Sequence, residues 1–319
     1  MHWKLKGSLQ KVLGWVPGGD ELHFQLQRRF GGLRDFGREF DIKMSDWEIM
    51  VARLAESDIR IPGQRLFEIG SGWYPTFPIA CYLAGARRVT TVDLNRHMRP
   101  KLLLACARRM ENFLAQIAAA VQVDEDEVRA RHVRLLDQLS VSGDLTAATD
   151  GVVEYHAPMD ATRTGFPQNQ FDCIFSNSVL EHVPPEVIDA MYVEALRILD
   201  VGGVMFHSVN CGDHYAYVDR SIHQLHYLRY SDAQWSRWNN AFLYQNRMRA
   251  HVFVERAEAL GFRILLNTAK PSELRMQQLA STPVHAQFAG IPPERLCITS
   301  VDFIARKPGR SDAAIAAAA

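Results

Sequence analysis

The regular alternation of short apolar strands with helices is the feature that most constrains the fold. Strands are expected at residues 65–69, 88–94, 151–156, 171–176 and 203–209, with helices at 76–84, 97–120 and 184–199 between them. A helix at 249–260 and two last strands at 262–266 and 296–305 follow. Continuous apolar strands joined through helices favour a doubly wound, mostly parallel α/β sheet of seven strands, with helices on both faces.

The segments outside this strand–helix alternation indicate how the chain divides into an N-terminal extension, a main domain with cap insertions and a C-terminal tail. A helical extension is expected over residues 1–43, with a break at Pro17-Gly18-Gly19, and the main domain over 44–309. Ser45 and Glu48 form a capping-box pattern that predicts a helix from residue 45 to about 59. A second such pattern at 124–127 predicts another helix, and the polar stretch 140–150 predicts a loop. Helical cap insertions are expected near 211–250 and 270–292, and the Ala-rich stretch 310–319 reads as a flexible tail.

The composition narrows the partners and the compartment. Lys plus Arg and Asp plus Glu both number 36, so the chain lacks the positive field on which binding to a nucleic-acid backbone rests. Its five cysteines are far apart and form no Cys-x-x-Cys pair, which favours a reducing compartment. Neither a signal-peptide pattern at the start nor an apolar run of about 20 residues is present, so we expect a cytoplasmic protein.

A glycine turn between the first strand and its helix suggests the ligand. Gly70-Ser71-Gly72 would let a ligand approach the backbone, and Asp93 follows about 20 residues on, at the position of an acid that holds ribose hydroxyls. A dinucleotide site would need a third glycine where this chain has Pro75. Glu68, just before the turn, would repel a diphosphate but would suit the cationic methyl donor S-adenosylmethionine.

Four segments taken in order carry a family resemblance: Glu68-Ile-Gly-Ser-Gly72, Thr91-Val-Asp-Leu-Asn95, Met159-Asp-Ala161 and Phe171-Asp-Cys-Ile-Phe-Ser-Asn-Ser-Val-Leu-Glu-His182. They resemble successive motifs of class I (Rossmann-like) S-adenosylmethionine-dependent methyltransferases, over roughly residues 45–306. In that family the last strands form an antiparallel C-terminal edge. The chain departs from the pattern at Trp73-Tyr74, where many members keep a small residue.

The resemblance implies a role for each matching residue. Glu68, Gly70, Ser71 and Gly72 would line the methionine end of the cofactor. The segment Asp93-Leu94-Asn95 would bind the ribose, with Asp93 as the main ligand. Asp160 and Ala161 would meet the adenine, and Asn177 and Ser178 would close the floor of the site. Each residue also has an ordinary structural interpretation: Asp160 could be a turn residue, and Glu181-His182 could simply open the next helix.

Methylation of a hydroxyl needs a proton acceptor, and two histidines follow strands that end at the expected crevice. His182 follows the fourth strand and His214 the fifth, so both are candidate bases. His207, within the fifth strand, reads as a core residue. Aromatic and polar residues are interleaved after residue 214 and could hold a polar small molecule, a sugar or a glycan intermediate. The candidate acceptor-binding residues among them are Tyr215, Arg229, Tyr230 and Asn246.

Several alternatives remain open. The leading hypothesis is O-methylation of a polar small molecule or sugar; the others are a non-catalytic S-adenosylmethionine-binding protein and an NAD(P)-dependent oxidoreductase. The chain reads Ser176-Asn-Ser-Val179 where methyltransferases of nucleic-acid bases have Asn/Asp-Pro-Pro-aromatic. No His, Asp and Cys cluster at metal-ligand spacing stands in the sequence, so no metal is expected. A basic amphipathic start, residues 1–15, could instead rest on an anionic membrane or pack on its own domain.

Overall fold

The computed structural model describes residues 2–13, 35–240 and 244–309. Its centre is a seven-stranded sheet of order β3-β2-β1-β4-β5-β7-β6. The strands are β1 (Arg65–Ile69), β2 (Arg88–Val92), β3 (Val153–His156), β4 (Phe171–Asn177), β5 (Leu199–Asn210), β6 (Arg263–Asn267) and β7 (Ser300–Arg306). Neighbouring strands from β3 to β5 are parallel, whereas β7 pairs antiparallel with both β5 and β6. The predicted fold class is confirmed. The antiparallel strand is β7, which lies between β5 and the edge strand β6.

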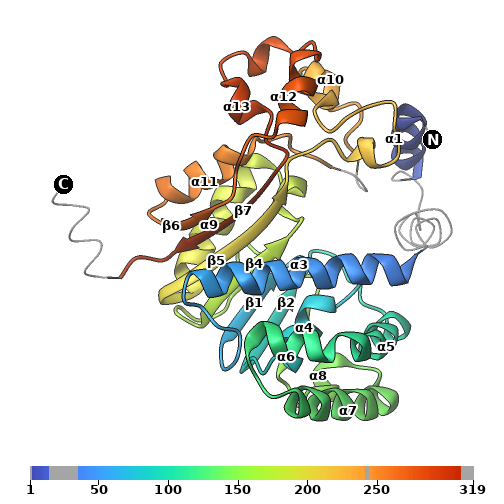
Figure 1. The fold of residues 1–319 in the computed structure, drawn as a ribbon, viewed down its shortest axis with the longest axis vertical. Coiled ribbons are helices and arrows are strands. Elements are labelled where there is room, and N and C mark those ends of the chain that lie inside the picture. The colour runs from blue at the N-terminus through green and yellow to red at the C-terminus, as the bar shows by residue number, and fades with distance from the viewer. Residues whose placement is uncertain (1, 14–34, 241–243, 310–319) are drawn as a thin grey trace.

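Helices cover the sheet on both faces (Figure 1). The first face carries α3 (Phe36–Glu56), α4 (Thr76–Leu83), α5 (Pro100–Arg109), α6 (Leu114–Val121), α7 (Glu125–Ser142) and α8 (Leu145–Ala148), with the short helix η2 (Met110–Phe113). The second face carries α9 (Pro185–Ile198) and α11 (Ala250–Ala259). In the part of the chain that the structure describes, no helix is long and apolar enough to span a membrane.

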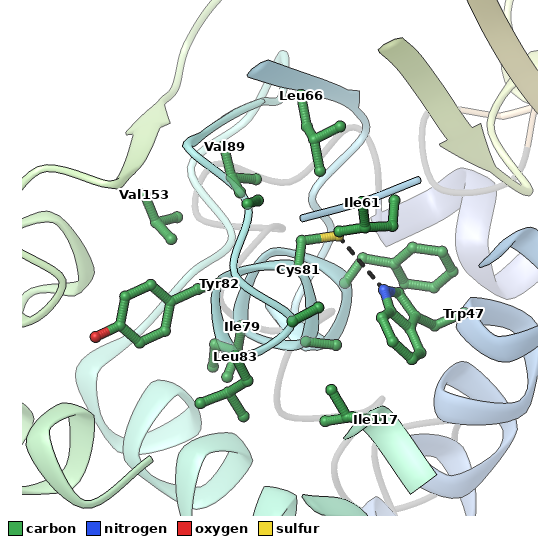
Figure 2. Close-up of a cluster of buried hydrophobic side chains, with 14 of the residues drawn as sticks. Trp47, Ile61, Leu66, Ile79, Cys81, Tyr82, Leu83, Val89, Ile117 and Val153 are labelled. Atoms are coloured by element: carbon green, nitrogen blue, oxygen red, sulfur yellow. Dashed lines mark hydrogen bonds between the residues drawn. The ribbon is translucent and has the colours of Figure 1, made fainter. Parts of the chain in front are cut away.

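The strands separate two hydrophobic cores because their side chains alternate between the faces. On β1, Leu66 enters the core under α3 and α4, whereas Phe67 enters the core under α9. Figure 2 shows the first core around Cys81, whose sulfur accepts a hydrogen bond from Trp47 Nε1 at 3.4 Å. All five cysteines are buried and unpaired, as small apolar residues of these cores.

Several expected element boundaries are wrong; among them, the last strand begins at Ser300 and not at residue 296. Ser45 does not cap a helix; its hydroxyl donates to the Asp41 carbonyl inside α3, which begins ten residues earlier at an Asp35 cap. The apolar spacing of Phe40 and Met44 carries the helix through the apparent cap. The division expected at residues 43 and 44 therefore falls inside α3. The helix expected over 97–120 is broken into α5, η2 and α6, and the predicted loop 140–150 contains the end of α7 and α8.

A cap stands beyond the carboxyl ends of the strands (Figure 1). It contains η4 (His214–Tyr217), η5 (His226–Arg229), α10 (Asp232–Trp235), α12 (Glu273–Ala280), η6 (Ala286–Phe288) and α13 (Pro293–Leu296). The N-terminal helix α1 (Trp3–Leu13) lies against it. Trp3 is buried among cap aromatic rings, 4.8 Å from Trp238 and 5.1 Å from His226 between centroids. The expected break at 17–19 and the tail from residue 310 lie outside the described residues.

Candidate active site

The turn after β1 is built for close approach by a ligand. Gly70 and Gly72 have φ angles of +85° and +61°, which glycine adopts without the strain that a side chain would bring. A Cβ at Gly70 would lie 2.4 Å from Val179 Cγ2, so the backbone there is also tightly packed. Backbone N–H groups of Gly70 and Ser71 donate to the Val92 carbonyl at 2.8 and 3.2 Å. The turn is thereby held at the carboxyl ends of β1 and β2.

Asp93 organises this turn from the end of β2. One carboxylate oxygen accepts a hydrogen bond from the Gly72 N–H at 3.0 Å, and the other accepts one from the Asn95 N–H at 3.0 Å. His97 Nε2 lies 3.8 Å from the same carboxylate. The structure thus brings together the glycine turn and the acid that the sequence analysis paired, with Leu94 and Asn95 exposed beside them.

Glu68 is buried beneath the turn, where the hydroxyl of Thr91 donates a hydrogen bond to it. Burial raises the pKa of the Glu68 carboxyl to about 8, while the Thr91 hydrogen bond and the charge of Lys43 act in the opposite direction. The hydroxyl of Ser71 is also buried and has no hydrogen-bond partner among the described residues. A buried carboxyl and a buried unsatisfied hydroxyl at one glycine turn are groups that a polar, cationic ligand would satisfy.

The other two segments predicted to contact the cofactor lie after β3 and at the end of β4. Asp160 is exposed, and its carboxylate accepts hydrogen bonds from the Thr162 N–H and hydroxyl, each at 2.8 Å, which is an Asx-turn geometry. After β4, Ser178 has a φ of +55° and its N–H donates to the Ser208 carbonyl at 2.9 Å. The Asn177 amide donates to Asp46 of α3 at 2.8 Å, which ties α3 to the end of β4.

A pocket of about 270 Å³ opens beside Asn177 and Ser178, at the carboxyl ends of β4 and β5. Most of its lining groups are hydroxyls, amides and one carboxylate; the lining residues are Asp46, Asn177, Ser178, Ser208, Val209, Asn210, Tyr217, Gln224, Thr299 and Ser300. The Tyr217 hydroxyl accepts hydrogen bonds from the Asn210 and Gln224 side chains at 2.6 and 3.1 Å. No lysine or arginine is among these lining residues, which disfavours an anionic molecule and leaves a pocket suited to a polar one.

The two predicted catalytic histidines meet next to this pocket. Their rings pack edge to face, with centroids 5.0 Å apart, and the His214 ring lies 5.6 Å from that of Tyr217. Burial lowers the pKa of both imidazoles, and the charges of His182 and Lys6 lower that of His214 further, to about 3. Both rings are therefore neutral near pH 7. His207, as expected, is a buried core residue and lies 2.7 Å from the Ser176 hydroxyl.

Glu181 joins this pair, and the sequence analysis did not assign it a site role. Ligand-type atoms of Glu181, His182 and His214 all lie within 4.8 Å of one another. Burial raises the pKa of Glu181 to about 8, and Lys43 and nearby backbone N–H groups partly offset that rise. Within the described residues neither carboxylate oxygen has a hydrogen-bond partner of good geometry. The signal that could have found it is the Glu-His pair that follows β4, one of the two strands that end at the pocket.

None of the four residues predicted to bind the acceptor lines this pocket. Tyr215 is buried under α1, with its hydroxyl donating to the Trp238 carbonyl at 2.9 Å. Arg229 is exposed and Tyr230 is half-buried against Trp3. Asn246 lies behind the histidine pair, where its amide donates to the Leu180 and Val183 carbonyls at 2.7 and 2.8 Å. Sequence reasoning missed the residues that line the pocket, chiefly Asp46, Tyr217 and Gln224, because three separate segments supply them.

A family model described as "Methyltransferase domain" matches residues 45–266, well over half of the chain. The chain belongs to this methyltransferase family. It is a class I, S-adenosylmethionine-dependent methyltransferase, as the motif order predicted, and membership favours this hypothesis over the oxidoreductase and non-catalytic alternatives. No curated protein matches the chain.

Solved structures of similar fold include three named proteins. The cyclase SpnF is 17% identical, with 82% of each chain covered and a TM-score of 0.44. An S-adenosylmethionine-dependent methyltransferase from Mesorhizobium loti is 15% identical, with 80% of this chain and 96% of that chain covered and a TM-score of 0.39. A phosphoethanolamine N-methyltransferase of Haemonchus contortus is 16% identical over 77% and 49% of the two chains, with a TM-score of 0.38.

Proposed function

We propose that this methyltransferase methylates a hydroxyl group of a polar small molecule or sugar bound in the pocket beside β4 and β5. The observation that carries the proposal is the polar, hydrogen-bonding lining of that pocket, together with a histidine pair in which the His214 ring packs on Tyr217 of that lining. The volume of about 270 Å³ lies near the lower limit for small-molecule sites, so it suits an acceptor of about monosaccharide size.

The cofactor contacts are proposed from the geometry of the glycine turn and from the family motifs. Asp93 would hold the ribose, Glu68 and the turn 70–72 would hold the methionine end, Asp160 and Ala161 would meet the adenine, and Asn177 and Ser178 would lie between cofactor and acceptor. When bound, S-adenosylmethionine supplies an electrophilic methyl group to the acceptor. The open φ-positive turn and the unsatisfied Ser71 hydroxyl fit such a ligand.

The chain's own contribution is to position the acceptor and to take up its proton. Asn210, Tyr217 and Gln224 form one hydrogen-bonded group on the pocket wall that can orient several hydroxyls. His214 Nε2 is buried without a partner among the described residues, so its lone pair is free to accept a proton. When the acceptor hydroxyl takes up the methyl group, its proton would pass to this nitrogen.

Methyl transfer to a panel of sugars, polyols and amines, followed by mass spectrometry and NMR of the product, tests this proposal. We expect products that carry an O-methyl group, and a kcat lowered by about 10²-fold or more in His214→Ala without a matching change in the KM for the methyl donor. His285→Ala, in the cap but outside the pair, is the control and should leave kcat unchanged. A product methylated only on nitrogen would overturn the choice of acceptor.

A further inference from the structure

We propose that Glu181, His182 and His214 form a binding site for a divalent first-row transition metal ion at the edge of the acceptor pocket. The three side chains come from two loops, one after β4 and one after β5, and their ligand atoms lie within 4.8 Å of one another. The ligands of one Zn²⁺ ion, each about 2.0–2.2 Å from it, lie roughly 3–4 Å apart. Side-chain movements of about 1 Å would therefore complete the site.

The carboxylate of Glu181 is the first argument for a cation. Both of its oxygens are buried without a hydrogen-bond partner of good geometry within the described ranges, and a bound cation would supply the partner that these buried polar atoms lack. No salt bridge joins Glu181 to a described lysine or arginine; Lys43 acts on it only through its charge. His214 Nε2 is a third buried atom without a partner among the described residues, and His214 belongs to the same cluster.

The ring of His182 is held through one of its two nitrogens. Its Nδ1 lies 2.6 Å from the Tyr244 carbonyl, to which it donates, and this leaves the Nε2 lone pair available. Metal-binding histidines characteristically donate their other ring N–H to a carbonyl or carboxylate, which fixes the tautomer and the ring plane. The Tyr244 carbonyl is such a partner.

Three consecutive residues of the cap hydrogen-bond to both loops that carry the cluster. Tyr244 binds the His182 ring, Gln245 accepts from the His214 N–H at 3.2 Å, and the Asn246 N–H donates to the Glu181 carbonyl at 2.9 Å. One short segment thus sets the distance between the two loops. This arrangement preorganises the cluster, as the supporting hydrogen bonds around metal ligands do.

Two imidazoles and one carboxylate favour Zn²⁺, Co²⁺ or a neighbouring ion over Mg²⁺ and Ca²⁺, which take oxygen ligands. Three protein ligands also leave a coordination position open, which is typical of catalytic sites. This catalytic meaning rests on the proposed function: an ion here would polarise an acceptor hydroxyl and lower its pKa, in place of an imidazole base. The cluster was not visible in the sequence because His182 and His214 are separated by the whole of α9 and β5.

Binding is measured on the full chain after treatment with EDTA, by calorimetry with Zn²⁺ and by the visible absorption of Co²⁺. We expect one ion per chain, and a Kd at least about 100-fold higher in Glu181→Gln and in His214→Ala. Glu181→Gln keeps the size of the side chain, and circular dichroism checks that each variant is folded. His285→Ala should bind as the wild type does.

Three results would overturn the metal site. They are an unchanged affinity for Zn²⁺ in both Glu181→Gln and His214→Ala, the absence of stoichiometric binding, and a Co²⁺–thiolate spectrum, which would implicate a cysteine. Methyl transfer measured with and without EDTA keeps the two proposals distinct. O-methylation that persists in EDTA, in a chain that binds no ion, would leave the proposed function standing and refute the metal site. Stoichiometric binding of the ion without any O-methylated product would support the metal site and refute the proposed O-methylation.

Discussion

At the scale of single residues, Glu68 makes the stability of the ligand-free protein depend on pH. Its folded pKa of about 8 exceeds the unfolded value of about 4.3, so the folded state binds the proton more tightly. The stabilisation that this tighter proton binding adds to the free energy of unfolding is fully present below about pH 4.3 and is lost as the pH rises toward 8. Between pH 5.5 and 8, the wild type should lose stability relative to Glu68→Gln, on the order of 3 kcal/mol.

Urea unfolding of both proteins at several pH values measures this difference. The Thr91 hydroxyl and the charges of Lys43 and Asp93, which also act on Glu68, are unchanged in the variant. Parallel pH profiles for the two proteins would contradict the prediction, because they would mean that Glu68 titrates alike in the folded and unfolded chains.

The two glycines of the turn should differ in their response to alanine. Gly70→Ala adds a Cβ 2.4 Å from Val179 Cγ2 at a φ of +85°, whereas a Cβ at Gly72 meets no atom within 4 Å. We expect Gly70→Ala to cost about 2–4 kcal/mol and Gly72→Ala about 1 kcal/mol, since only the first adds a clash to the strain. Adding Val179→Ala should restore part of the stability of Gly70→Ala. Thermal unfolding of the wild type, the two glycine variants and the Gly70→Ala/Val179→Ala double variant measures these losses. Equal losses of stability in Gly70→Ala and Gly72→Ala would refute this ranking.

At the scale of elements, α1 should depend on a single side chain for its position. The Trp3 side chain is buried among cap aromatic rings, whereas Leu5 is 63% exposed. The backbone N–H of Trp3 also donates to Asp219 at 2.9 Å, a contact that an alanine at this position would keep. An isolated helix of this length is marginal in water, so its docking must come from such contacts. We expect Trp3→Ala to remove about 3 kcal/mol of docking free energy and to release α1 while the sheet stays folded.

Hydrogen exchange of residues 2–13 would show this release, with Leu5→Ala as the control that keeps α1 protected. Unchanged protection in Trp3→Ala would mean that other contacts hold the helix. The buried Trp3 also favours packing on the chain's own domain over the membrane contact considered for residues 1–15.

The elements that the sequence predicted well are those whose burial pattern is local. β1 and α4 have the expected bounds because a run of apolar residues ends at glycine in each case. The start of α3 was missed because its register depends on contacts of Phe40 and Met44 with distant helices, which outweigh the local capping signal at Ser45. The pocket was missed for the same reason, since tertiary structure alone places Asp46 beside Asn177.

At the scale of the whole molecule, the cofactor site exists only in the folded chain. Its proposed residues stand in four segments, 68–72, 93–95, 160–161 and 177–178, and the parallel sheet aligns their strands at one edge. A ligand that contacts all four segments binds the folded state and not the unfolded one. Linkage then predicts that S-adenosylhomocysteine at 100 times its Kd stabilises the fold by about 2.7 kcal/mol.

Thermal unfolding with S-adenosylhomocysteine should therefore show a Tm higher by several degrees, and NADH at the same concentration should give no rise. Asp93→Ala removes both the proposed ribose contact and the hydrogen bonds to Gly72 and Asn95, so the ligand-dependent rise should vanish. Asp93→Asn keeps one acceptor oxygen for the turn and separates the two effects, because it should retain much of the stability of the free protein while losing most of the affinity. If Asp93→Ala kept the full rise in Tm, the ligand would be binding away from the glycine turn, and the shared edge of β1, β2 and β4 would not be the cofactor site.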